Sequence, residues 1–163
     1  NSATEIVVAR DAVEKSRIWE ARRVAIPALA RCRPTLMLED ATVPRSKIPA
    51  MLEALDKIAA RHHVTIGTFG HAGDGNLHIY ACSNDLEKDV FVQQVDDFMS
   101  KLYAKTMELG GQISGEHGIG RGKIKYLAEA VGPTNIALMQ GIKKVFDPKL
   151  LLNPGKVFTL PEA

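Results

Sequence analysis

The sequence predicts an α+β fold, a ferredoxin-like antiparallel sheet with its helices on one face, plus N- and C-terminal helical segments. Two strand-like runs meet at a Gly-Asp-Gly turn, and one amphipathic helix precedes them while another follows. From residue 35 the order is strand, helix, strand, strand, helix, strand. We expect three parts: a helical segment at residues 1–34, the ferredoxin-like core at 35–120, and C-terminal helices with an extended tail at 121–163.

The first half of the chain alternates helical and extended patterns. Residues 3–30 have apolar side chains among charged ones and predict a helix, which Pro27 is expected to interrupt. Residues 35–40 (TLMLED) predict the first strand. Residues 46–62 place apolar side chains at helical spacing, with Ser46 as the candidate N-cap.

The middle of the chain predicts a hairpin followed by a long helix. Residues 64–69 alternate large and small side chains, and residues 78–82 form a second apolar run. The Gly-Asp-Gly sequence at 73–75 suits a tight turn between them. Residues 86–109 carry a stripe of large apolar side chains, and Gly110 follows as a common helix terminator.

The last third of the chain begins with a short strand and ends in a tail. Residues 112–114 predict a fourth strand, which leads into GEHGIGRGK. Residues 122–147 predict two short helices, because Gly132 and Pro133 interrupt the helical pattern between them. The closing LLNPGKVFTLPEA predicts an extended tail.

Composition excludes several classes of protein. The net charge of +2 gives no argument for nucleic acid or for an anionic membrane. No run of eighteen apolar residues exists, and the N-terminal residues lack the hydrophobic core of a secretory signal. Cys32 and Cys82 have no metal-type spacing and are expected to be small buried side chains. These features predict a cytoplasmic protein.

The segment HAGDGNLH and the later Glu-His dipeptide predict a metal site. His71 and His78 flank a turn in which Gly73 and Gly75 permit positive φ angles, so a hairpin can bring both rings together. Glu116, in a glycine-flanked loop, is the candidate third ligand. Two histidines and one carboxylate suit a catalytic zinc with an open coordination position, and manganese or iron would accept similar ligands. The alternative is that both histidines are turn residues satisfied by hydrogen bonds.

Three neighbouring side chains are candidates for supporting roles. Asp74 is a candidate partner that orients a ligating ring. His117 is a candidate general base for a hydroxyl proton, the alternative being a ring held by a backbone hydrogen bond. Arg22 could bind a substrate carboxylate in a bidentate pair, although by itself it also fits an ordinary surface arginine.

The glycine-rich segments do not indicate a nucleotide site. The glycines of GEHGIG do not follow the GxGxxG spacing, and GDGNLH places His78 where the third glycine would stand. No phosphate-binding P-loop sequence occurs. By composition, NPGK near the C-terminus is a turn.

Five segments occur together in the order in which one enzyme family carries them. They are Trp19-Glu20-Ala21-Arg22, Glu39-Asp40 with Pro44, HAGDGNLH at 71–78, GEHGIG at 115–120 and NPGK at 153–156. In these segments the chain resembles the C-terminal portion of the FAD-linked oxidases of the vanillyl-alcohol oxidase superfamily. Its nearest resemblance is to the D-2-hydroxy-acid dehydrogenases, which include the FAD-linked subunit of glycolate oxidase and D-lactate dehydrogenases.

The resemblance implies a role for each candidate residue. The two histidines and the glutamate would hold the metal, which would engage the carboxylate and hydroxyl of a 2-hydroxy acid. His117 would accept the hydroxyl proton while hydride leaves for flavin N5. Arg22 would position the carboxylate, and Asn153 would lie near the flavin. Residues 35–120 would then be the substrate- and metal-binding cap, and the tail would be flavin-proximal.

The resemblance also bears on substrate and partners. Relatives of the 2-hydroxyglutarate type carry Lys and Asn where this chain has Leu38 and Tyr80, which favours glycolate or D-lactate over an acid with a second carboxylate. The family binds FAD mainly through an N-terminal domain, so the chain is expected to be a fragment that is inactive alone. Its expected partners are that domain and an iron-sulfur subunit, with attachment at the inner face of the membrane through such partners left open.

Two other functions fit parts of the pattern. One is a flavin-free zinc hydrolase, with a zinc-bound water as nucleophile and His117 or Asp74 as base. The other is a non-enzymatic ferredoxin-like domain used for association or metal sensing. Exposed apolar surface, ready for another domain, would favour the flavoenzyme, whereas a closed polar surface with a deep pocket would favour the hydrolase. A symmetric interface over the sheet would favour the association domain.

Overall fold

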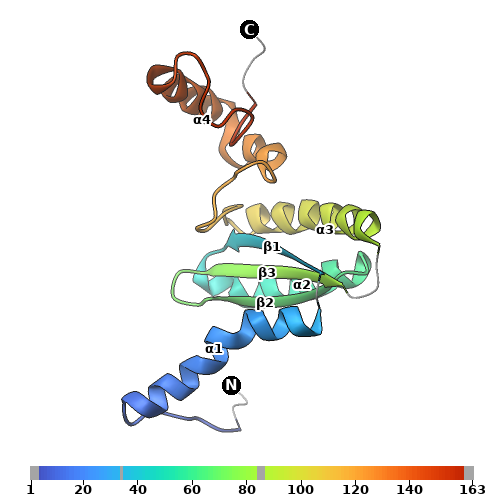
Figure 1. The fold of residues 1–163 in the computed structure, drawn as a ribbon, viewed down its shortest axis with the longest axis vertical. Coiled ribbons are helices and arrows are strands. Elements are labelled where there is room, and N and C mark those ends of the chain that lie inside the picture. The colour runs from blue at the N-terminus through green and yellow to red at the C-terminus, as the bar shows by residue number, and fades with distance from the viewer. Residues whose placement is uncertain (1–3, 34, 84–86, 160–163) are drawn as a thin grey trace.

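The computed structural model describes residues 4–33, 35–83 and 87–159 and has the predicted α+β class. Some positions that the sequence predictions included lie outside the described residues. They are residue 3, Pro34, residue 86 and the end of the tail. The elements are α1 (Ala12–Cys32), β1 (Thr35–Thr42), the 3-10 turn η1 (Arg45–Lys47), α2 (Ile48–Arg61), β2 (Thr65–His71), β3 (Asn76–Ser83), α3 (Lys88–Glu108) and α4 (Ile124–Phe146) (Figure 1).

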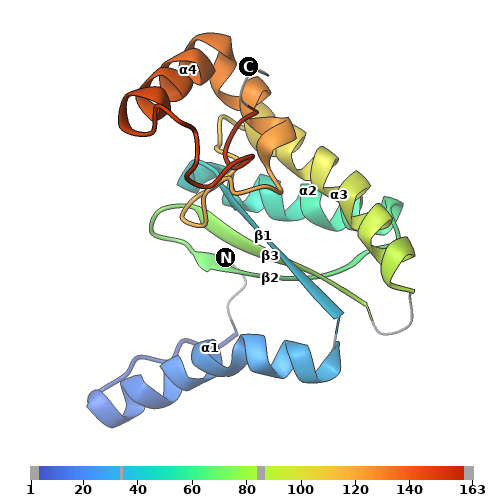
Figure 2. The ribbon, with the colours of Figure 1, turned by 45° about the horizontal axis from the view of Figure 1, so that its top comes forward.

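The sheet has three antiparallel strands in the order β1-β3-β2. β3 lies in the centre and is buried along its whole length. α2 and α3 pack together on one face, and α1 runs past the opposite face (Figure 2). The central strand between two strands that run parallel to each other is the split βαβ arrangement that the sequence predicted.

The predicted fourth strand is reduced to one bridge. The N–H of Thr42 donates to the carbonyl of Gln112 at 3.0 Å, and the N–H of Gln112 donates back at 2.8 Å. This bridge lies on the free edge of β1, where a fourth ferredoxin-like strand would pair. The strand predicted at 112–114 is therefore wrong, because pairing stops at Gln112 and the carboxylate of Asp40 accepts the hydroxyl of Ser114 and the N–H groups of residues 115–117.

The hydrophobic core lies between the sheet and the pair α2 and α3. The side chains predicted to form the stripe of α3 are buried as far as Leu102, and Leu109 is partly buried. Ser46 does not cap α2, since it belongs to the preceding 3-10 turn and α2 begins at Ile48. The core residues contributed by β3 and α3 are Leu77, Ile79, Ala81, Phe91, Val95, Phe98, Met99, Leu102 and Tyr103.

Helix α1 differs from its prediction in both extent and packing. It begins at Ala12, where the Asp11 carboxylate accepts the N–H groups of Val13 and Glu14. It passes through Pro27 without ending, and none of its residues is buried. Cys32, expected inside, is exposed at its end. The apolar side chains of residues 3–30, which helical spacing made candidate packing contacts, include five that are exposed: Ile6, Val7, Val13, Ile18 and Trp19.

The C-terminal part of the chain folds back onto the glycine-rich loop. α4 contains the predicted interruption at Gly132, which has a φ of 78° and a non-helical ψ. In the tail, the N–H of Val157 donates to the carbonyl of Gly120 at 2.7 Å. Within the described part of the chain, no helix is both long enough and apolar enough to span a bilayer. The division into three parts at residues 34 and 120 stays a prediction.

Candidate metal centre

The hairpin β2–β3 places both histidines on the sheet face that α2 and α3 leave open. Leu77 and Ile79 of β3 point into the core, so His78 between them points to the other face. His71 ends β2, and the turn that follows returns the chain to β3. Gly75 in this turn has a φ of 83°, and a Cβ there would lie 1.9 Å from the carbonyl oxygen of Val43. Only glycine fits this position.

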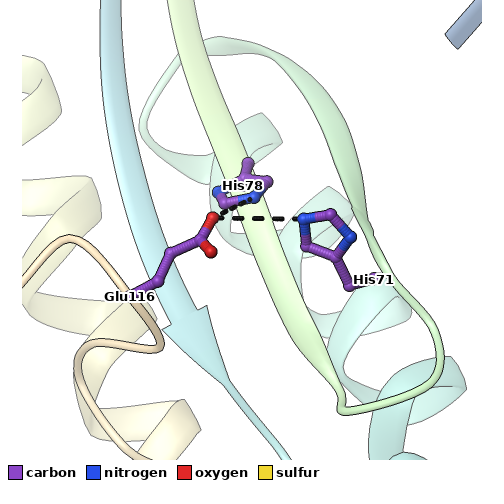
Figure 3. Close-up of side chains that lie close together, drawn as sticks. All are labelled: His71, His78 and Glu116. Atoms are coloured by element: carbon purple, nitrogen blue, oxygen red, sulfur yellow. Dashed lines mark ion pairs between the residues drawn. The ribbon is translucent and has the colours of Figure 1, made fainter.

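The structure brings His71, His78 and Glu116 together, as the sequence predicted (Figure 3). The Oε1 atom of Glu116 lies 3.1 Å from Nε2 of His78 and 4.0 Å from Nε2 of His71. One ligand atom from each residue lies within 4.8 Å of the others. The side chains of His71 and Glu116 are 49% and 52% exposed, while that of His78 is 8% exposed. The cluster is therefore anchored on one buried ring and open to solvent on one side.

The donor atoms of this cluster fit a divalent metal. Zinc takes His nitrogen and carboxylate oxygen at about 2.0–2.2 Å, so its ligand atoms lie at most about 4.4 Å apart. Both distances to Glu116 satisfy that limit. Burial lowers the pKa of His78 although Glu116 opposes the shift, which favours the neutral ring that metals bind. Nδ1 of His78 is buried and has no hydrogen-bond partner among the described residues, so these residues do not satisfy both ring nitrogens.

His117 lies beside the cluster, where a base would be needed. Its ring stacks on that of His78 with 5.0 Å between the centroids and 16° between the planes. Its Nε2 atom lies 3.6 Å from Oε1 of Glu116, and its Nδ1 atom lies 4.0 Å from Oδ2 of Asp40. His117 is 40% exposed, so one side of the ring stays accessible to a substrate.

Asp40, at the end of β1, holds the loop that carries Glu116 and His117. Its carboxylate is fully buried and accepts the N–H groups of Gly115, Glu116 and His117 at 2.8, 3.1 and 2.8 Å. It also accepts the hydroxyl of Ser114 at 2.8 Å. Burial by itself would raise the pKa of Asp40, but these hydrogen bonds outweigh it and lower the pKa. Beyond the resemblance, no role was predicted for Asp40. The sequence feature that could have pointed to it is an acidic residue at the end of an otherwise apolar predicted strand.

A buried lysine connects this loop to the opposite face of the sheet. Lys123 donates to the carbonyl oxygens of Asp40 and Ile113 at 2.8 and 3.0 Å. Its Nζ atom also lies 3.9 Å from the carboxylate of Glu39, which accepts the hydroxyl of Tyr103. Burial lowers the pKa of Lys123 and raises that of Glu39. The sequence analysis missed Lys123, since it is one lysine in a basic, glycine-rich segment.

The other predicted site residues lie at varying distances from the cluster. Arg22 on α1 faces the same side of the sheet as His78: burial raises the pKa of Tyr80, and the Arg22 guanidinium partly offsets this. The contact that the described residues show for the Asp74 carboxylate is with the turn itself, where it accepts the N–H of Asn76, and not with a histidine ring. Asn153 lies in the tail, with a positive φ of 48°, in the segment that returns to Gly120.

The described residues around Asn153 do not enclose a flavin. They line a pocket of about 130 Å³ together with Lys143, Leu152, Gly155 and Lys156. Cofactor pockets usually measure about 300–1,000 Å³. The pocket around Asn153 is therefore too small to enclose FAD by itself.

Comparison with known proteins places these residues in a family context. A family model described as "FAD linked oxidases, C-terminal domain" matches residues 1–157. The chain is 46% identical over 157 residues to a D-lactate dehydrogenase of Anaerostipes hadrus, covering 95% of the chain and 33% of the relative. It is 45% identical over 156 residues to glycolate oxidase subunit GlcD of Bacillus subtilis, covering 96% and 33%. A D-2-hydroxyglutarate dehydrogenase of Xanthomonas citri is 38% identical over 160 residues, covering 96% and 34%. The chain thus spans about a third of the length of these relatives.

Proposed function

The chain belongs to the C-terminal domain family of the FAD-linked oxidases, and we propose that it is the substrate- and metal-binding part of a FAD-dependent D-2-hydroxy-acid dehydrogenase. The observation that carries the proposal is the convergence of His71, His78 and Glu116 beside His117 on one open sheet face. Membership of this family implies FAD as the cofactor, which other parts of such an enzyme would hold.

The metal ligands, His117, Arg22 and Asn153 would each have a distinct role in substrate oxidation. The metal, when bound, would supply a Lewis acid that lowers the pKa of the substrate hydroxyl. His117 would take the hydroxyl proton at a nitrogen of its partly exposed ring. Arg22 would hold the substrate carboxylate, since it lies over the same face of the sheet as His78. Asn153 would meet the flavin from the tail.

A small substrate, glycolate or D-lactate, suits the surroundings of His78. Leu38 and Tyr80 are cross-strand partners, and Asp40 and His78 form the next such pair on the same face. Leu38 is apolar and a phenol such as that of Tyr80 has no cationic form, so neither side chain offers a positive charge to a second carboxylate. Hence the site favours an acid with a single carboxylate.

Exposed apolar surface supports docking with a flavin-binding domain. Monomeric proteins rarely leave large contiguous apolar patches open. Here such side chains occur along α1 and again on α4 and the tail, which argues against a closed hydrolase domain. An iron-sulfur subunit remains a proposed partner through the likeness to glycolate oxidase. The most exposed apolar residues of α4 and the tail are Leu138, Ile142, Val145, Phe146, Leu151 and Leu152.

Metal removal tests this function in the flavoprotein that contains the chain. Turnover of D-lactate, glycolate and D-2-hydroxyglutarate would be measured before chelation, after it, and after zinc or manganese is restored. We expect chelation to lower turnover by about 100-fold and reloading with metal to restore it, because a Lewis acid lowers the activation barrier by several kcal/mol. We also expect D-lactate or glycolate to exceed D-2-hydroxyglutarate in kcat/KM. Full activity in the metal-free enzyme would contradict the proposal.

A further inference from the structure

Asp40 is the most deeply buried carboxylate near the metal centre, yet it is not in the cluster of candidate ligands. A buried charge is costly unless hydrogen bonds compensate it. Within the described residues, the hydrogen bonds to this carboxylate all come from one four-residue segment, Ser114 to His117, and the Nζ atom of Lys123 lies 3.9 Å from Oδ2. The Asp40 carboxylate therefore fixes the conformation of that segment.

The two oxygens of Asp40 accept different bonds, which together define the loop. Oδ1 accepts the N–H of Gly115, whereas Oδ2 accepts the hydroxyl of Ser114 and the N–H groups of Glu116 and His117. Ser114 in turn accepts the N–H of Gly118 at 2.8 Å. Consecutive N–H groups that converge on one anion fix the peptide planes between them, and thereby the directions of the side chains.

The loop is also held at its base and along its inner side. Lys123 donates to the carbonyl of Asp40 and to that of Ile113, the residue before the loop, so strand and loop share one cation. Gly115 lies so close to the sheet that a Cβ there would be 2.4 Å from Oγ1 of Thr42 and 2.5 Å from Oδ1 of Asn76. The carboxylate thus holds a loop that already rests directly on the sheet.

We propose that Asp40 is the positioning residue of the metal centre, holding residues 114–117 so that Glu116 meets His71 and His78 while His117 lies beside them. The consequence for metal binding rests on the proposed function, whereas the consequence for the loop does not. Asp40 touches neither metal nor substrate. It acts through the backbone of Glu116 and His117.

The test replaces Asp40 by asparagine, which keeps the shape but turns one acceptor into a donor that faces backbone N–H groups. Amide hydrogen exchange of the chain, followed by NMR, measures the protection of the loop amides. Zinc titration measures the affinity of the metal site. In Asp40→Asn we expect exchange of the 115–117 amides to accelerate about tenfold or more, since hydrogen bonds to charged groups are strong. We expect the zinc Kd to rise about 10- to 100-fold, as when a group that orients ligands is removed. The amides of β3 should stay protected.

A matched control is Asp147→Asn, the same change in a buried carboxylate that accepts the N–H groups of Leu151 and Leu152 in the tail. It should loosen the tail while leaving the loop amides and zinc affinity unchanged. If Asp40→Asn does not fold, Ser114→Ala removes one bond to Asp40 and should give a smaller effect in the same direction.

Two results would overturn the positioning role. One is unchanged exchange of the 115–117 amides in both loop variants. The other is equal acceleration in β3, which would make Asp40 a support of the whole sheet. If the unaltered chain binds no zinc, the proposed function fails, and the exchange of the loop amides still decides whether Asp40 positions the loop.

Discussion

In the proposed FAD-dependent dehydrogenase, replacing His117 by alanine is expected to lower kcat by about 10²–10⁴, which is the usual contribution of a positioned general base. The ring stacks on His78 and keeps an accessible side, so its loss removes the proton acceptor without removing a member of the ligand cluster. The measurement is kcat and KM with D-lactate and glycolate, beside zinc content. KM should change much less than kcat, because Arg22 and the metal ligands remain.

The zinc content of His117→Ala separates a base from a ligand. Nε2 of His117 lies 3.6 Å from Oε1 of Glu116, near enough that a fourth ligand is the competing role. We expect zinc to stay at the level of the unaltered protein. Loss of zinc together with activity would make His117 a ligand, and unchanged kcat would remove it from the mechanism. The control is His62→Ala, at the C-cap of α2, which should leave the zinc content and kcat unchanged.

Gly75→Ala is expected to lower the free energy of unfolding by roughly 3 kcal/mol or more. The position has a φ of 83°, and an added Cβ would lie 1.9 Å from the carbonyl oxygen of Val43, which belongs to the backbone and has little freedom to move. The N–H of Val43 also donates to the carbonyl of Gly75 at 3.1 Å, so any shift of the turn breaks that contact. Denaturant unfolding of the variant measures the loss.

Gly73→Ala is the matched control in the same turn. A Cβ at Gly73 would meet no heavy atom within 4 Å among the described residues other than its chain neighbours, and its φ is not positive. We expect its unfolding midpoint to stay close to that of the unaltered chain. Equal midpoints for Gly75→Ala and Gly73→Ala would mean that the turn relaxes freely, and the account of how the hairpin places His71 and His78 would be wrong.

The sequence analysis succeeded where short-range pattern decides the structure. Alternation and the Gly-Asp-Gly turn located β2 and β3, and helical spacing located α2 and α3. Because His71 and His78 flank that turn, their approach followed from the hairpin. Glu116 required more, since it lies 38 residues beyond His78 along the chain. Its residue type and glycine-flanked loop made it the candidate third ligand, but no local pattern indicated that this loop would meet the hairpin.

The errors arose where tertiary contacts override local pattern. Residues 112–114 read as a strand, but a buried carboxylate 74 residues earlier in the chain takes the hydroxyl of Ser114 and the N–H groups that follow it. Local spacing cannot reveal such a bond. In α1, apolar spacing suggested packing, yet no residue of the helix is buried in this chain. Pro27 failed to end α1 because a proline can be accommodated inside a helix at the loss of one backbone hydrogen bond.

The most direct test of the central claim is the metal content of the purified chain by elemental analysis, beside the variant His71→Ala/His78→Ala. The control is His62→Ala/His63→Ala, in two adjacent histidines that directly follow α2 and do not belong to the ligand cluster. The account predicts about one zinc or manganese per chain in the unaltered protein and in the control, and almost none when the two ligands are removed. A chain that holds no metal after incubation with zinc, or a double variant that retains it, would contradict the assignment of His71, His78 and Glu116 as a metal site.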